Sequence, residues 1–138
     1  MCLCIILLIA NCSCKRDDFD SIVAREWKKC NGSSNCIVDF AFILNFDWDT
    51  MCFYSGACSL DEINKDLGFK LKEFTDIGDR IIFLKNGKVV YQKEWFPMPS
   101  KPPEGTIFKT DLKKFRVNKS DSKFILIKEG KAFFLTKL

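Results

Sequence analysis

The stretch IVDFAFILNFDWDTMCFY, residues 37–54, decides the fold because it is the longest apolar and aromatic run outside the first fourteen residues. Its large side chains recur at every second position, the period at which a β-strand places them on one face. Strands usually end within about ten residues, so we expect a bend or bulge near Asp47–Thr50 rather than one long strand. The alternating set consists of Val38, Phe40, Phe42, Leu44, Phe46 and Trp48.

Two hairpins are expected after this stretch. Asn86-Gly87 is the strongest turn signal in the chain, because both residues tolerate the positive φ that a two-residue turn needs. The flanking strands carry apolar side chains on both faces, which favours a place in the middle of a sheet. A second hairpin is predicted around Glu129-Gly130. Counting outward from Asn86-Gly87 pairs Leu84 with Val89, Ile82 with Tyr91 and Phe83 with Val90.

Helical patterns occur at two places in the chain. Apolar residues at helical spacing predict a helix from Phe19 to about Asn31. Ser59 and Glu62 form a capping box that opens a short second helix, and Gly68 supplies its left-handed end.

The order of these elements predicts the fold class. Helices are followed by hairpins without an internal repeat, so we expect one α+β domain over residues 19–138. It should contain an antiparallel sheet of about five to seven strands, with the two short helices on one face. We expect the following side chains to lie mostly buried in the core of that sheet: Phe40, Phe42, Leu44, Phe46, Trp48, Ile82, Leu84, Val89, Tyr91, Leu126 and Phe133.

The first fourteen residues, MCLCIILLIANCSC, carry no charged side chain and about ten consecutive apolar positions. This run is too short to span a bilayer as a helix and is typical of a signal peptide. It resembles the signal of bacterial lipoproteins, in which a short apolar run ends at a cysteine that receives lipid. Cys12 is the predicted lipidation site and Cys14 the alternative, so residues 1–11 form the signal peptide and 12–18 a lipidated, charged tether. The other interpretation is a buried N-terminal strand or helix.

Four further cysteines occur in two pairs with the same spacing. Cys30 and Cys36 bracket a turn-rich loop, and Cys52 and Cys58 repeat that separation. In an exported protein each pair is a candidate disulfide, and closing so short a loop stabilises the fold by roughly 2 kcal/mol. A four-cysteine zinc site is a second interpretation, although zinc ligands are usually separated by about two to four residues. Buried free thiols are the third.

The charge of the chain is uneven. Residues 101–138 contain ten basic and four acidic side chains, whereas the net charge of the whole chain is +4. We predict a partner surface on the proline loop Met98–Gly105 and the basic stretch after it, because prolines lower the ordering cost of binding and cations steer an acidic partner. The alternatives are nucleic-acid binding, with Phe108 and Phe115 stacking on bases, and a solvated strand edge. The cations are Lys109, Lys113, Lys114, Arg116 and Lys119.

Asp47 and Asp49 are the candidate polar site, because they share one face of the expected strand. A D-x-D pair can hold a divalent cation, and paired carboxylates can serve glycoside hydrolysis. The simpler interpretation is that Trp48 anchors the core while the two carboxylates hydrogen-bond the adjacent turn. The chain contains no histidine, which removes the commonest general base and metal ligand. We therefore predict a protein without catalytic residues, metal or cofactor.

A family resemblance is carried by Phe46-Asp47-Trp48-Asp49, by the segment from Met51 to Gly56, and by Ser59-Leu60-Asp61-Glu62-Ile63. This arrangement resembles a group of small bacterial lipoproteins, in which an F-x-W-D element precedes a strand and a helix that opens with S-x-x-E-I. Val89-Val90-Tyr91 matches a later strand of that group. Relatives carry a Pro-Tyr pair where this chain has Ala57-Cys58. The resemblance covers roughly residues 37–96 and, more weakly, the chain from Phe108 onward. It implies localisation and fold without naming a reaction.

Together these features predict an exported lipoprotein of the bacterial cell envelope, anchored by lipid to the outer or cytoplasmic membrane and facing the periplasm or the cell surface. Its expected role is non-catalytic binding or an association with the envelope. A small inhibitor or immunity-type protein that binds a protein partner is the alternative. We expect a monomer that contacts the membrane through its lipid and binds no nucleic acid.

Overall fold

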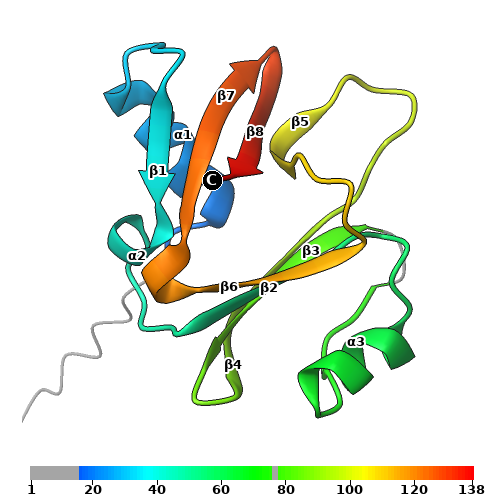
Figure 1. Ribbon diagram of the computed structural model, residues 1–138. Coiled ribbons are helices and arrows are strands. Elements are labelled where there is room, and N and C mark those ends of the chain that lie inside the picture. Colours follow the sequence, from blue (N-terminus) through cyan, green and yellow to red (C-terminus); the bar gives the residue numbers. More distant parts are fainter. Residues whose placement is uncertain (1–15, 76–77) are drawn as a thin grey trace, which may run out of the picture.

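The computed structural model describes residues 16–75 and 78–138 (Figure 1). These residues form an α+β domain of three α-helices, a 3-10 turn and eight strands, which confirms the predicted fold class. The helices are α1 (Phe19–Lys29), α2 (Phe40–Ile43) and α3 (Leu60–Leu67), and the 3-10 turn η1 is Lys119–Asp121. The strands are β1 (Cys36–Asp39), β2 (Thr50–Tyr54), β3 (Asp79–Lys85), β4 (Lys88–Trp95), β5 (Glu104–Phe108), β6 (Lys114–Asn118), β7 (Lys123–Glu129) and β8 (Lys131–Lys137).

The strands are divided between two four-stranded sheets. The first sheet has the order β1-β7-β8-β5, and the second has the order β4-β3-β2-β6. Neighbouring strands among the described residues are antiparallel, except that β5 runs parallel to β8. The sequence predicted one sheet, whereas the structure has two because the stretch 37–54 contributes β1 to the first sheet and β2 to the second.

A short helix interrupts the stretch where an alternating strand was expected. Strand β1 ends at Asp39, whose Oδ1 accepts a hydrogen bond from the Ala41 backbone N–H at 3.0 Å and so caps α2. The hydroxyl of Ser122 donates to the same oxygen at 3.0 Å, which fixes the cap from the other end of the chain. The turn rotates Phe42 outward, and its side chain is 85% exposed. The prediction that Phe42 is buried was therefore wrong, while Trp48 is buried as expected.

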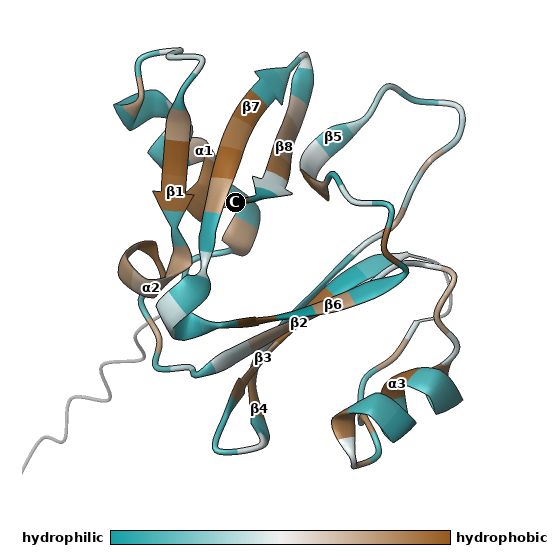
Figure 2. Cartoon of the chain, viewed as in Figure 1, coloured by the Kyte–Doolittle hydropathy of each residue, from teal (hydrophilic) through white to brown (hydrophobic). Residues whose placement is uncertain are grey.

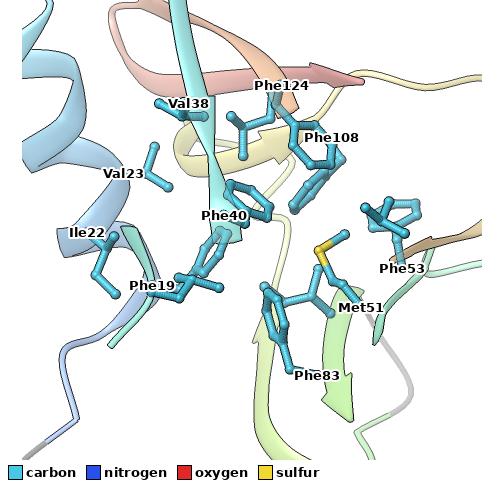
Figure 3. Close-up of a cluster of buried hydrophobic side chains, with 14 of the residues drawn as sticks. Phe19, Ile22, Val23, Val38, Phe40, Met51, Phe53, Phe83, Phe108 and Phe124 are labelled. Carbon is cyan, nitrogen blue, oxygen red and sulfur yellow. The ribbon is translucent and has the colours of Figure 1, made fainter. Parts of the chain in front are cut away.

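The main core lies between α1 and the facing sides of the two sheets (Figure 3). Phe19 on α1 meets Phe40 edge to face at 5.4 Å and Phe83 on β3 at 6.1 Å. Phe40 also stacks on Phe124 of β7 at 4.6 Å. Figure 2 shows hydrophobic residues along β1 and β7, the strands that contribute Val38, Phe124 and Leu126 to this core.

Helix α3 covers the opposite face of the second sheet, whereas both helices were predicted on one face. Ile63 on α3 packs with Ile82 of β3. The next residue, Phe83, belongs to the main core on the other face of the sheet. The predicted capping box is present, because Ser59 accepts from the Glu62 backbone N–H and Glu62 accepts from that of Ser59. Gly68 ends the helix at φ 80°, also as predicted.

The β3–β4 hairpin forms at Asn86-Gly87, but its register contains a bulge between Phe83 and Leu84. Leu84 pairs with Val89 as predicted, whereas Ile82 pairs with Gln92, and Tyr91 lies opposite Phe83. The bulge adds one residue to β4, so the predicted pairs Ile82–Tyr91 and Phe83–Val90 were wrong.

The same hairpin occupies the edge of the second sheet rather than its middle, because β4 pairs with β3 alone. Val89 is accordingly 39% exposed, so its predicted burial was wrong. Tyr91 and Phe133 are partly buried at the margin of the main core. No helix within residues 16–75 and 78–138 is long and apolar enough to cross a bilayer.

Candidate functional site

The proline loop joins the end of β4 to the start of β5 (Figure 1). A groove of about 480 Å³ opens beside it. Its volume falls within the range of ligand sites, which runs from roughly 300 to 1,000 Å³. Phe96 and Met98 are exposed there, so apolar surface faces the solvent. The lining residues are Asp79, Trp95, Phe96, Pro97, Met98, Pro99, Lys101, Pro102, Pro103, Glu104, Thr106 and Ile107.

A partly buried hydrogen-bond clamp on Asp20 positions the walls of this groove. The indole N–H of Trp95 donates to both carboxylate oxygens of Asp20, at 3.0 and 3.2 Å, and the backbone N–H of Thr106 donates to Oδ1 at 3.0 Å. Lys93 Nζ lies 3.0 Å from Oδ2. Burial raises the pKa of this carboxyl group, but the hydrogen bonds from its three partners outweigh burial and hold the pKa below its usual value.

Two glycines allow the backbone to approach at the same place. A Cβ added at Gly78 would overlap the carbonyl oxygen of Trp95. The backbone before β3 can therefore approach the end of β4 this closely only because residue 78 is a glycine. Gly105 has φ +78°, and its Cβ position lies 3.4 Å from Asp20 Oδ2. The first residues of β5 therefore depend on a glycine for the geometry that brings Thr106 to the clamp.

The predicted basic stretch does not form a free cationic surface. Lys113 pairs with Glu62 at 2.7 Å, and both Lys114 and Arg116 pair with Asp66, at 2.7 and 3.2 Å. Asp66 also accepts a hydrogen bond from the Tyr54 hydroxyl at 2.6 Å. Burial raises the pKa of Asp66, but the hydrogen bonds outweigh it and lower the pKa to about 2. These cations therefore face the acidic side of α3.

The remaining two cations of the stretch lie elsewhere. Lys119 is 3.6 Å from Asp47, beyond the end of β6. Lys109 has no ion pair with any described residue, and it borders a second hollow of about 270 Å³ between the two sheets. Phe108 and Phe115, the predicted stacking residues, pack against each other at 6.1 Å and belong to the main core or its margin. Phe108 is buried, and Phe115 is partly buried and stacks on Phe53 at 4.9 Å.

Asp47 and Asp49 hold the hairpin turn instead of meeting each other at a polar site. Asp47 pairs with Lys85 at 3.1 Å, and the hydrogen bond from this lysine lowers the pKa of the exposed carboxyl group. Asp49 Oδ2 accepts from the Asn86 backbone N–H at 2.8 Å, which lowers its pKa as well. In the part of the chain that the structure describes, no three acidic or cysteine side chains converge in a way that suits a metal ion.

The four internal cysteines divide into two kinds. Cys30 and Cys36 form a disulfide that joins the end of α1 to the start of β1. Cys52 and Cys58 are free and buried, and burial raises the pKa of the Cys52 thiol. The predicted lipidation residues, Cys12 and Cys14, lie outside the described residues.

Sequence reasoning found the proline loop but missed the residues that shape its groove. The pair Trp95-Phe96 offered a local signal, because aromatic side chains often line binding pockets. Asp20 offered none, since its partners lie more than seventy residues away. The chain matches no protein-family model, no curated protein and no solved structure.

Proposed function

We propose that this chain is an exported, lipid-anchored protein of the bacterial cell envelope that binds a protein partner without catalysis, using the groove beside the proline loop. The proposal includes Cys12 as the lipidated residue, with Cys14 as the alternative. The resemblance of Phe46-Asp47-Trp48-Asp49 to the F-x-W-D element of small bacterial lipoproteins is also part of the proposal.

The observation that carries the export proposal is the disulfide between Cys30 and Cys36 in a chain whose apolar N-terminal run ends at a lipoprotein-type cysteine. Disulfides persist in oxidising compartments and are rare in the cytosol of most bacteria. A short apolar run followed by charged residues is the pattern of a cleaved signal. Both features favour the same location.

The binding proposal is supported by the composition of the groove. Prolines and large apolar side chains form its walls, while Asp79, Lys101 and Glu104 add charge. Such a surface suits an apolar side chain of a protein partner, with polar groups at the rim that fix its orientation. The hydrogen bonds to Asp20 hold Trp95 and Thr106 in place, and walls that are held in this way before a partner arrives lower the entropic cost of binding.

Metabolic labelling with a fatty-acid analogue tests the anchor. Wild-type protein should carry the label, and Cys12→Ala should lose it. Label that survives Cys12→Ala and disappears in Cys14→Ala would move the anchor by two residues. Protein that remains unlabelled and in the cytosol would contradict the proposal.

A photo-crosslinking amino acid at Met98 tests the groove in the native cell. We expect a defined cross-linked protein at Met98 and none at Ile127, an exposed apolar position on β7. Tight, stoichiometric capture of one soluble protein would favour the inhibitor or immunity role over a general envelope role. Equal cross-linking at both positions would show that the groove is not the binding site.

A further inference from the structure

Arg16, where the described chain begins, is fixed against the folded domain. Its guanidinium Nη1 donates a hydrogen bond to the carbonyl oxygen of Val90, and its Cζ lies 5.3 Å from the centre of the Phe46 ring. Phe46 in turn stacks on Tyr91 at 5.1 Å and is buried. The start of the domain is therefore attached at the β3–β4 hairpin and at the segment before β2.

The position of Arg16 limits where a lipid on the preceding chain can lie. Cys12 is four residues before Arg16, and four residues span at most about 14 Å. A domain of this size has a diameter of roughly 30 Å or more. A lipid on Cys12 therefore keeps the bilayer close to the surface around Arg16, and a lipid on Cys14 keeps it closer still.

One large apolar side chain is exposed near this surface. Phe42 is 85% exposed on α2, four residues from the Phe46 ring on which Arg16 rests. Val89 is also exposed in the β3–β4 hairpin, but it pairs with Leu84, so its side chain lies on the face of the sheet that α3 covers. An exposed phenylalanine of this kind can enter the interface between lipid headgroups and acyl chains.

Cations lie at the β3–β4 hairpin and beside it. Lys85 and Lys119 share Asp47, at 3.1 and 3.6 Å, so two positive charges meet one carboxylate. Lys88, in the same hairpin, has no ion pair with any described residue. Arg16 also lacks an acidic partner among them, since it contacts a carbonyl and an aromatic ring. Asp49, which accepts from the Asn86 backbone N–H, is a second carboxylate at this turn. Four cations thus face two carboxylates, and the surface carries net positive charge.

We propose that the domain lies on the bilayer through this membrane-contact face, defined as Arg16, Phe42, Lys85, Lys88 and Lys119. Phe42 enters the lipid interface, and the cations contact anionic headgroups. The inference rests on the proposed lipid anchor, which brings the face to the membrane. Each lysine near an anionic surface contributes about a fivefold gain in partitioning, the equivalent of roughly 1 kcal/mol.

A second exposed apolar surface provides a matched control. Ile127 on β7 is 41% exposed and lies near the Glu129–Gly130 turn, at the end of the strand. The start of β7 is the end near α2, because Lys123 pairs with Asp39 there. Ile127 should remain in water when the membrane-contact face lies on lipid. Lys131, exposed next to the same turn, is the corresponding control for charge.

Quenching by brominated lipid tests the orientation in the full-length, lipidated protein. The protein is reconstituted in vesicles of equimolar phosphatidylcholine and phosphatidylglycerol, and the fluorescence of its native tryptophans is subtracted using wild type. We expect the added tryptophan of Phe42→Trp to be quenched and that of Ile127→Trp to be unaffected. Quenching of Ile127→Trp alone, or of neither variant in protein that carries lipid, would overturn the proposal.

A measurement without the anchor separates this inference from the proposed function. The full chain carrying Cys12→Ser and Cys14→Ser is mixed with the same vesicles, and its partition coefficient is determined by flotation. Lys88→Gln should lower the coefficient about fivefold, while Lys131→Gln leaves it unchanged. Equal effects of both substitutions would overturn the membrane-contact face. Failure of the anchor alone would appear in the fatty-acid labelling and leave this partitioning intact.

Discussion

The Trp95 indole N–H donates to both carboxylate oxygens of Asp20, at 3.0 and 3.2 Å, and thereby joins the end of β4 to the first turn of α1. Because the same carboxylate accepts from the Thr106 backbone N–H, one side chain holds β4 and β5 at once. The groove beside the proline loop therefore depends on a residue that does not line it.

Replacing Asp20 with Asn should lower the free energy of unfolding by about 1 to 3 kcal/mol, because hydrogen bonds to a charged acceptor are lost or weakened. Urea denaturation at neutral pH measures the change. Asp121→Asn is the control, since its carboxylate is largely exposed in its pair with Lys137 and should change stability by less than about 0.5 kcal/mol. Equal losses in the two variants would contradict the clamp.

The contribution of Asp20 should also depend on pH. Its folded-state pKa lies below the ordinary value of 3.8, so the stabilisation is fully present above that value and is lost as pH falls through the folded-state pKa. The difference in stability between wild type and Asp20→Asn should therefore shrink below about pH 4. A difference that stays constant down to pH 2 would show that the charge of Asp20 is not what stabilises the clamp.

Trp48 and Phe42 should respond very differently to truncation. Trp48 is 1% exposed and meets Phe83 edge to face at 5.0 Å, so Trp48→Ala should cost about 3 to 5 kcal/mol. Phe42→Ala should cost less than about 0.5 kcal/mol, because that side chain is exposed. Thermal and urea unfolding of the two variants provide the comparison, and similar losses would place Phe42 in the core after all.

The two pairs of cysteines should differ in reactivity and in their effect on stability. Cys30→Ser with Cys36→Ser should destabilise the fold by about 2 kcal/mol, the value expected for so short a loop. Cys52 and Cys58 should resist alkylation in the native protein, because both thiols are buried. Site-resolved mass spectrometry with and without urea distinguishes the pairs. Rapid native alkylation of Cys30 or Cys36 would contradict the disulfide.

Charge reversal in the basic stretch should act on folding through α3. Lys114→Glu places a carboxylate against Asp66 and should cost about 1 kcal/mol, because the exposed pair becomes a repulsion. Lys109→Glu is the control, since it removes no ion pair among the described residues and should leave the urea midpoint nearly unchanged. An equal shift in both variants would indicate a general charge effect.

The local signals in the sequence predicted local structure correctly. Asn86 and Gly87 adopt positive φ of 50° and 72°, and the capping box at Ser59 forms with both of its hydrogen bonds. Such features need only residues a few positions apart, so they can be recognised without knowledge of the fold.

The break in the decisive stretch was not predictable in the same way. The cap at Asp39 depends on the Ser122 hydroxyl, and the Phe40 backbone N–H donates to the Ser122 carbonyl oxygen at 3.1 Å. Those partners come from the turn before β7, more than eighty residues later. The alternating pattern predicted a strand, but hydrogen bonds from a distant part of the chain stabilise a helical turn at this place. Phe42 is therefore exposed where the pattern predicted a core residue.

In the candidate site too, local features were predicted from the sequence and long-range contacts were not. The prolines identified the loop, whereas the clamp on Asp20 and the ion pairs with α3 arise from contacts between distant elements. Lys113 meets Glu62 because β6 pairs with β2 and α3 covers that sheet. Composition alone placed Lys113, Lys114 and Arg116 on a free surface, since it contains no information about which acids they face.

The pairing of β1 with β7 sets Cys36 opposite Leu126, about ninety residues further along the chain. If the chain crosses a membrane starting with its N-terminus, β1 emerges long before its partner strand. During that interval its hydrogen-bonding edges are unpaired and open to association with other chains. The disulfide between Cys30 and Cys36 joins residues only six apart, so it can close without β7. In that case α1 and β1 would already be joined by the disulfide before β7 reaches its place beside β1.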